Sequence, residues 1–233
     1  NSLSVTTGDN FFADANLDVD NGIAITAPGS IQFDNATSAT SIVLGAQTGS
    51  ITVDNVTAGG NVSLQANANV LTGGIGAGTS VFGRANGTFT TGNINAGRFI
   101  DLRSGRALPL GNLNAGDYID LRSDSPISIL NALCGETINL QTQGTLTTGS
   151  VTAGNNILGQ AAGAINVGIL SAGLVDPGTP SGAQYRVSLA SNSTITTANV
   201  SALGNIGFGT PAHLLTGSLS SGGGLMALVG GNM

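Results

Sequence analysis

The stretch FTTGNINAGRFIDLRS, residues 89–104, is followed nineteen positions later by LPLGNLNAGDYIDLRS, residues 108–123. Both segments have Ala-Gly near the centre and end on Ile-Asp-Leu-Arg-Ser. A small residue followed by Gly recurs at this spacing through much of the chain. The small residues of these seven pairs are Ala58, Ala77, Ala96, Ala115, Cys134, Ala153 and Ala172. A fixed period near twenty residues indicates one short structural unit stacked on copies of itself.

Apolar residues alternate with polar ones on both sides of each Gly, which is the period of a β-strand. Three positions after the Gly stand Val62, Val81, Ile100, Ile119, Ile138 and Ile157, and eight before it stand Ile51, Val70, Phe89, Leu108, Ile127, Leu146 and Ile165. Such short strands bury their apolar face only when equivalent strands of successive copies pair in parallel. The sequence therefore predicts an all-β, right-handed parallel β-helix of about eleven 19-residue rungs, roughly 50 Å long.

The same register extends beyond the regular repeats and predicts a single domain. Residues 30–233 are expected to form the regular β-helix, and residues 1–29 one or more irregular N-terminal rungs. The inward residues expected near the N-terminus are Phe12, Leu17, Val19, Ile23 and Ile25. At the corners, Gly is expected to turn the backbone with a positive φ. Cys134 is expected to fill a small buried slot that holds Ala in the other repeats.

Composition restricts the classes of function. The chain has six Arg, no Lys and a net charge of −6, so it lacks the basic face that general nucleic-acid binding requires. It contains no run of roughly 18 apolar residues, so no membrane-spanning segment is predicted. A single Cys and a single His exclude a His/Cys metal cluster by count, and no metal or cofactor is predicted. A chain that starts at Asn1 without a visible signal peptide is expected to be a processed or excised piece.

Three repeats carry a resemblance to a known family. They are GSITVDNVTAGGNVSLQA (residues 49–66), TFTTGNINAGRFIDLRSG (residues 88–105) and TLTTGSVTAGNNILGQAAG (residues 145–163). This pattern resembles the repeats of filamentous-haemagglutinin-like proteins, which are bacterial adhesins exported by two-partner secretion or as autotransporter passengers. The resemblance implies a structural shaft without catalytic activity that is secreted or displayed on the bacterial cell surface. The NPNG and NPNL motifs of the family's export-recognition region have no counterpart here, so the chain resembles the central shaft.

Stacked repeats also predict ladders of charged side chains on the outside of the rod. An outward row contains Gln65, Arg84, Arg103, Arg122, Gln141 and Gln160; two positions earlier stand Asp101, Asp120 and Asn139, and Arg98 stacks against Asp117. In one interpretation, Asp and Arg offset each other across rungs and keep the rod soluble, each pair contributing about 0–1 kcal/mol. In the other, the arginines form a recognition patch for the carboxylates or phosphates of an acidic ligand such as an acidic sugar.

The repeat is interrupted once. After Gly173 the expected apolar pair arrives eleven residues late, at Val187 and Leu189. The insertion spans residues 174–184, and its turn-forming candidates for a binding loop are Asp176, Pro177, Gly178 and Pro180. On a repeat scaffold, an insertion of this kind is either a binding loop or a tolerated decoration. The sequence leaves both open.

Three classes of function fit these observations. The first is the adhesin shaft, with no catalytic residue and with other copies of itself, end to end or lateral, or host and cell-surface glycans or proteins as partners. The second is a polysaccharide-binding or polysaccharide-cleaving β-helix protein, whose clustered carboxylates would be Asp101, Asp117, Asp120 and Asp124. The third is ice binding, for which the outward Thr52 and Thr90 belong to an irregular row that Leu71 and Pro109 interrupt.

Overall fold

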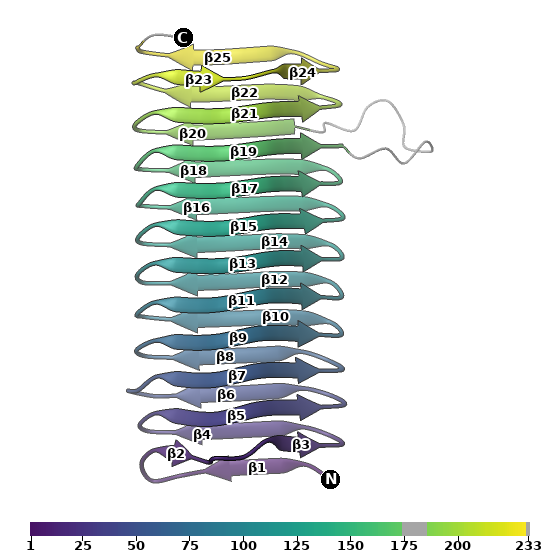
Figure 1. Cartoon of the computed structure of the whole chain (residues 1–233), viewed down its shortest axis with the longest axis vertical. Coiled ribbons are helices and arrows are strands. Elements are labelled where there is room, and N and C mark those ends of the chain that lie inside the picture. Colours follow the sequence, from purple (N-terminus) through teal and green to yellow (C-terminus); the bar gives the residue numbers. More distant parts are fainter. Residues whose placement is uncertain (174–185, 232–233) are drawn as a thin grey trace.

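The chain forms two parallel β-sheets that stack turn upon turn along one axis, as the computed structural model of the protein shows (Figure 1). The structure describes residues 1–173 and 186–231. Within these residues every regular element is a strand, so the all-β prediction is confirmed. Each turn contributes one strand to one sheet, bends, and contributes the next strand to the other sheet. The result is a β-solenoid of about eleven turns, with two strand faces rather than three.

Sheet A contains twelve strands and sheet B has thirteen. In spatial order, sheet A consists of β1 (Leu3–Thr6), β4 (Ile23–Ala27), β6 (Ile42–Ala46), β8 (Val62–Ala66), β10 (Ser80–Ala85), β12 (Phe99–Ser104), β14 (Tyr118–Ser123), β16 (Thr137–Thr142), β18 (Asn156–Ala161), β20 (Arg186–Ser191), β22 (Asn205–Thr210) and β25 (Leu225–Val229). Sheet B consists of β2 (Phe11–Phe12), β5 (Ile31–Ser38), β7 (Ile51–Ala58), β9 (Val70–Ala77), β11 (Phe89–Ala96), β13 (Leu108–Ala115), β15 (Ile127–Cys134), β17 (Leu146–Ala153), β19 (Ile165–Ala172), β21 (Ile195–Ala202) and β23 (Leu214–Thr216), with β3 (Leu17–Val19) on β5 and β24 (Leu219–Ser221) on β21.

The strand pairing follows the register that the repeats predict. Cys134 pairs with Ala115 on one side and with Ala153 on the other, each nineteen residues away. Val187 pairs with Ile157, which confirms that the apolar pattern resumes eleven residues late. Because every residue lies above its equivalent in the previous turn, the inward and outward rows run unbroken along the described part of the rod.

The predicted inward position of Phe12 is wrong by one residue. Phe11 is the residue that pairs with Ile31, and its ring meets that of Phe33 edge-on at 6.2 Å between centroids. Phe12 is 63% exposed. Successive side chains of a strand point to opposite faces, so a slip of one residue exchanges the buried and the exposed position. The interpretation failed here because β2 has only two residues, both of them Phe.

The core is a single column of buried, mostly aliphatic side chains between the two sheets. Its width is nearly constant because large and small residues compensate within a turn. Leu64, Leu102 and Leu121 occupy one inward row, and Gly83 takes the same position in β10. The buried ring of Phe89 fills the space there, since a Cβ built on Gly83 would lie 2.4 Å from its Cε2. Close packing of this kind tolerates little change in volume.

The corner glycines are required for close approach and not for a positive φ. Among the described residues, Gly173 alone has a positive φ, of 82°, so the expectation for the other corners is wrong. A Cβ on Gly78 would lie 2.0 Å from the carbonyl oxygen of Gly59, and one on Gly97 would lie 2.1 Å from that of Gly78. From Gly59 to Gly154, each corner rests directly on the backbone of the corner before it, which leaves no room for a side chain. The equivalent positions before Gly59 and after Gly173 are occupied by Ala39 and Leu203.

At the bend that follows the sheet A strands, buried hydroxyl groups bind successive turns together. The Ser104 hydroxyl donates to the carbonyl of Gly87 in the preceding turn at 2.7 Å, and it accepts the backbone N–H of Arg106. The hydroxyls of Ser123, Thr142, Ser191 and Thr210 at the same bend also donate to a backbone carbonyl one turn earlier. Ser38 and Ser221, which end sheet B strands, make the same contact at the other corner. These contacts satisfy bend groups that sheet hydrogen bonds leave free.

On sheet B, side-chain amides nineteen residues apart form a ladder. Asn112 donates from Nδ2 to the Oδ1 of Asn93 at 3.0 Å, and Asn131 donates to Asn112 at 2.8 Å. A second run of the same kind joins Asn55, Asn35 and Asn16. Stacked amides of this kind support the parallel register along the axis.

Cys134 occupies the small buried slot predicted for it. The thiol is free, and the residue is 3% exposed. Burial raises its pKa from 9.0 to about 11, because the thiolate would lose its hydration in the core.

A raised pKa in the folded state gives a specific pH dependence of stability. The folded chain holds the thiol proton more tightly than the unfolded chain, so the thiol's contribution is complete below pH 9 and is lost as the pH rises towards 11. Cys134→Ala removes this contribution at a cost of less than about 1.5 kcal/mol at neutral pH. In urea titrations, we expect the stability advantage of the wild type over Cys134→Ala to shrink between pH 9 and pH 11. A difference that stays constant over this interval would contradict the burial argument.

Candidate binding surface

The predicted charged patch lies on the outer face of sheet A, over four neighbouring strands. Arg84 in β10, Arg103 in β12 and Arg122 in β14 are register partners, with Gln65 before them and Gln141 after them. Asp101, Asp120 and Asn139 form the parallel row on the same face. The structure therefore brings together the outward residues that the nineteen-residue spacing placed in ladders. Parallel pairing with exact alternation puts both rows on the solvent side, because the intervening residues fill the core.

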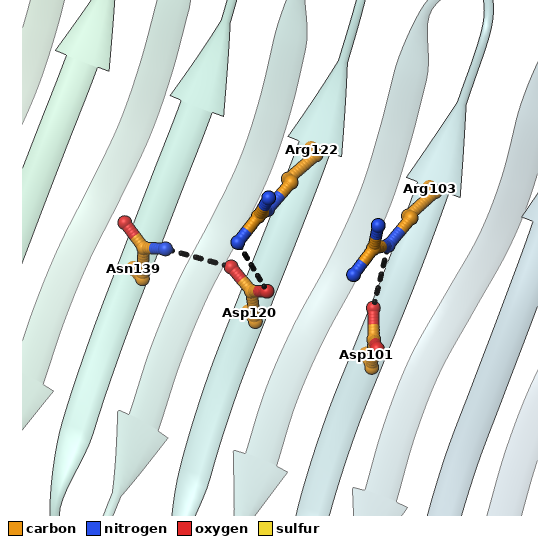
Figure 2. Close-up of polar contacts among 5 residues, drawn as sticks. All are labelled: Asp101, Arg103, Asp120, Arg122 and Asn139. Carbon is orange, nitrogen blue, oxygen red and sulfur yellow. Dashed lines mark hydrogen bonds and ion pairs between the residues drawn. The ribbon is translucent and has the colours of Figure 1, made fainter.

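The ion pairs on this surface run mainly along strands. Arg103 Nε lies 3.4 Å from Asp101 Oδ1, and Arg122 Nη2 lies 3.3 Å from Asp120 Oδ2, each within one strand (Figure 2). Asp120 also accepts a hydrogen bond from the amide of Asn139 at 2.8 Å, across one turn (Figure 2). The prediction that Asp and Arg offset each other across rungs holds for Arg98 and Asp117, which meet at 3.0 Å. Exposed pairs of this kind contribute only about 0–1 kcal/mol, but they orient the guanidinium groups.

Arg84 differs from the two arginines stacked on it. In β10 the position equivalent to Asp101 is occupied by Phe82. Arg84 has no ion pair among the residues that the structure describes, and its side chain is exposed. Its donors are therefore available to a ligand, whereas those of Arg103 and Arg122 are shared with a neighbouring carboxylate.

Three aromatic rings continue the surface beside the charges. Phe82 and Phe99 meet edge-on at 5.6 Å, and Phe99 stacks on Tyr118 at 4.8 Å with an interplanar angle of 8°. The guanidinium carbon of Arg98 lies 5.4 Å from the centroid of Phe99. Phe82 and Tyr118 keep 38% and 39% of their surface exposed. The result is an apolar strip in which Phe99 and Tyr118 lie one row away from Asp101 and Asp120, and Phe82 lies in the row of the aspartates.

Two shallow hollows flank Arg84. One, of about 240 Å3, is lined by Ser63, Leu64, Gln65, Phe82, Gly83, Arg84 and Asp101. The other, of about 340 Å3, lies towards the bend and includes Arg84, Arg103, Arg122 and Asp124. A hollow with an aromatic wall and convergent polar groups is the form that small-molecule and saccharide sites take.

The sequence pointed to the charged ladder but missed the aromatic strip. The signal was available for Phe99 and Tyr118, which stand at equivalent repeat positions. Phe82 belongs to the Asp row instead, so its contact with Phe99 is diagonal and depends on the twist of the sheet. The predicted binding loop, with Asp176, Pro177, Gly178 and Pro180, lies outside the described residues.

Residues 1–173 and 186–231 contain no group of three or more His, Cys, Asp or Glu arranged to hold a metal ion. A helix of the length and hydrophobicity needed to cross a bilayer is likewise absent from this part of the chain.

No match is found among protein-family models, curated proteins or solved structures. The resemblance of the repeats to filamentous-haemagglutinin-like proteins therefore stays a prediction. The features that bear on function are the rod itself and the surface over β10 to β16.

Proposed function

We propose that this chain is a structural shaft of a secreted or cell-surface bacterial adhesin or fibre, without catalytic activity. The observation that carries the proposal is the stack of in-register turns around one hydrophobic core in the described residues. In a solenoid each turn contacts only its neighbours, so length can grow by adding turns without redesigning the fold. The resemblance of the repeats to adhesin shafts supports the same function.

Localisation provides the direct test of this proposal. Antibodies raised against the folded chain should label intact cells of the source bacterium, or material shed into the medium. An antibody against a cytosolic enzyme should label only lysed cells and serves as the control. Labelling of this chain only after lysis would rule out the shaft proposal.

The shaft proposal also predicts that length follows repeat number. Inserting a second copy of residues 89–107, nineteen residues, should add one turn of about 4.8 Å to the rod. Small-angle scattering would measure the increase, and circular dichroism would show whether the β content rises in proportion. An unchanged length, with the extra residues forming a loop, would contradict a freely extendable shaft.

A second function, polysaccharide binding, is favoured by the surface over β10 to β14. Arginine, aromatic and amide side chains converge there around shallow hollows. Polysaccharide cleavage is less well supported, because Asp101 and Asp120 are each held by an arginine of their own strand.

End-to-end association of copies remains a prediction. Within the described residues, β25 pairs only with β22, and Leu225, Met226 and Leu228 are exposed. An uncovered strand edge of this kind recruits further strands. Sedimentation velocity over a range of concentrations would detect filaments, and a strict monomer at high concentration would count against them.

A further inference from the structure

A row of neighbouring hollows extends along the solenoid axis from the two beside Arg84. A third hollow, of about 590 Å3, begins with Gln141 and Thr142 and extends to Val229. Arg122 and Ser123, which line the second hollow, pair with Gln141 and Thr142 in the next turn. The second and third hollows therefore follow one another at the same bend, while the first opens on the outer face of sheet A; we call the three together the groove. They present arginines at one end and amides, including Gln143, Gln160 and Asn192, further along.

The chemistry at the Arg84 end suits a sugar acid. An exposed aromatic ring, such as that of Phe82, offers an apolar face to the C–H side of a pyranose. Arg84 has unshared donors in a fork that matches a carboxylate. Gln65, Ser63 and Asp101 line the same hollow and can exchange hydrogen bonds with sugar hydroxyls.

We propose that this groove binds a linear polysaccharide that carries carboxylates, with one uronate seated between Phe82 and Arg84. The carboxylate lies against Arg84, and the chain extends past Arg103 and Arg122 towards the amide-lined part of the groove. This inference rests on the proposed function and deepens it, since it gives the shaft a lateral binding surface and names the chemical class of its partner.

The charges on the surface favour a glycan with one carboxylate per sugar over a highly sulfated one. The three arginines are accompanied by Asp101 and Asp120 on the sheet and by Asp124 in the second hollow. A highly sulfated glycan carries more negative charge per sugar, and these carboxylates would repel it more strongly. A polyuronate has one carboxylate per sugar, and hydroxyls that the aspartates can accept hydrogen bonds from.

The test compares four probes by isothermal titration calorimetry with the full chain. They are an oligogalacturonate, its neutral methyl ester, dextran sulfate and a short single-stranded DNA. We expect oligogalacturonate to bind most tightly and the methyl ester to bind at least tenfold more weakly. Equal binding of the acid and its ester would overturn the proposal. Tighter binding of dextran sulfate or DNA, or binding of none of the four, would overturn it as well.

Variants then locate the site. Arg84→Gln should weaken oligogalacturonate binding about tenfold, and Phe82→Ser should weaken binding of both the acid and the ester. Arg186→Gln, the same change at an exposed arginine of β20, is the matched control and should leave binding unchanged. Arg84 and Arg186 are exposed, so the unfolding curves of their variants should coincide with that of the wild type. Phe82→Ser also loses the edge-on contact with Phe99, so its binding is compared in the absence of denaturant, under conditions where its circular dichroism matches that of the wild type. Equal effects of Arg84→Gln and Arg186→Gln would place binding elsewhere. None of these outcomes affects the localisation test, so the shaft proposal and the groove proposal can be refuted independently.

Discussion

Replacing Gly78 with alanine should lower the free energy of unfolding by about 3 kcal/mol, as overpacking against rigid backbone does. The new Cβ would lie 2.0 Å from the Gly59 carbonyl oxygen and 2.8 Å from its carbon. Neither atom can rotate away as a side chain would, so the two turns must separate. Separation would also weaken the neighbouring sheet hydrogen bonds. Urea unfolding followed by circular dichroism would measure the loss.

Gly76→Ala is the matched control for this prediction. Gly76 lies two residues earlier, and a Cβ there meets nothing nearer than 3.7 Å, to the Thr57 Oγ1. The control should change stability by less than about 1 kcal/mol. Gly78→Asn separates two explanations of the corner, because Asn tolerates a positive φ far better than Ala. Steric exclusion predicts that Asn is at least as damaging as Ala, and a well-tolerated Asn would refute it.

Exchanging the sizes of two core residues should produce strong energetic coupling. Gly83→Leu alone forces a side chain against Phe89 and against the Cδ2 of Leu102, whose flexible end can turn aside, and Phe89→Val alone leaves a cavity beside Gly83. We expect each single change to cost about 3 kcal/mol. The double variant recreates the Leu64 and Val70 combination of the preceding turn and should lose less than either single variant.

A double-mutant cycle in urea would measure this coupling, expected at about 2–3 kcal/mol or more. Leu121→Ala combined with Phe89→Val provides the comparison, because Leu121 lies in the same inward row two turns away. Changes at these two positions should add. If the losses of unfolding free energy at Gly83 and Phe89 were also additive, the Phe89 ring would not be filling the space left by Gly83.

The nineteen-residue period predicts most of the fold, because each sequence repeat forms one turn of the solenoid. In a stacked solenoid, residues nineteen apart are spatial neighbours, so aligning the repeats shows which residues lie next to each other in successive turns. The place of Cys134, the charged ladder, the amide ladder and the late return at Val187 all follow from that spacing. The predicted inward position of Phe12 is wrong because two adjacent Phe residues show no alternation of apolar and polar side chains.

Several features could be read only from the tertiary structure. The number of strands per turn depends on how sharply each bend closes. The role of the corner Gly depends on the distance to the preceding turn, and repeat positions do not encode distances. Whether an ion pair forms within one strand or across two turns depends on side-chain length and orientation. Asp101 pairs with Arg103 of its own strand, and Asp117 pairs with Arg98 of the preceding turn.

By itself the sequence determined the β-solenoid, its register and the rows of residues that face outward. Because the turns stack, the period of the sequence directly gives which residues are adjacent along the axis. The tertiary structure alone decided what those rows form together: an aromatic strip that crosses rows diagonally, an arginine with no carboxylate partner among the described residues, and hollows on the sheet A face and at its bend. Such features depend on twist, side-chain volume and distance between rows, and a repeat alignment contains none of these quantities.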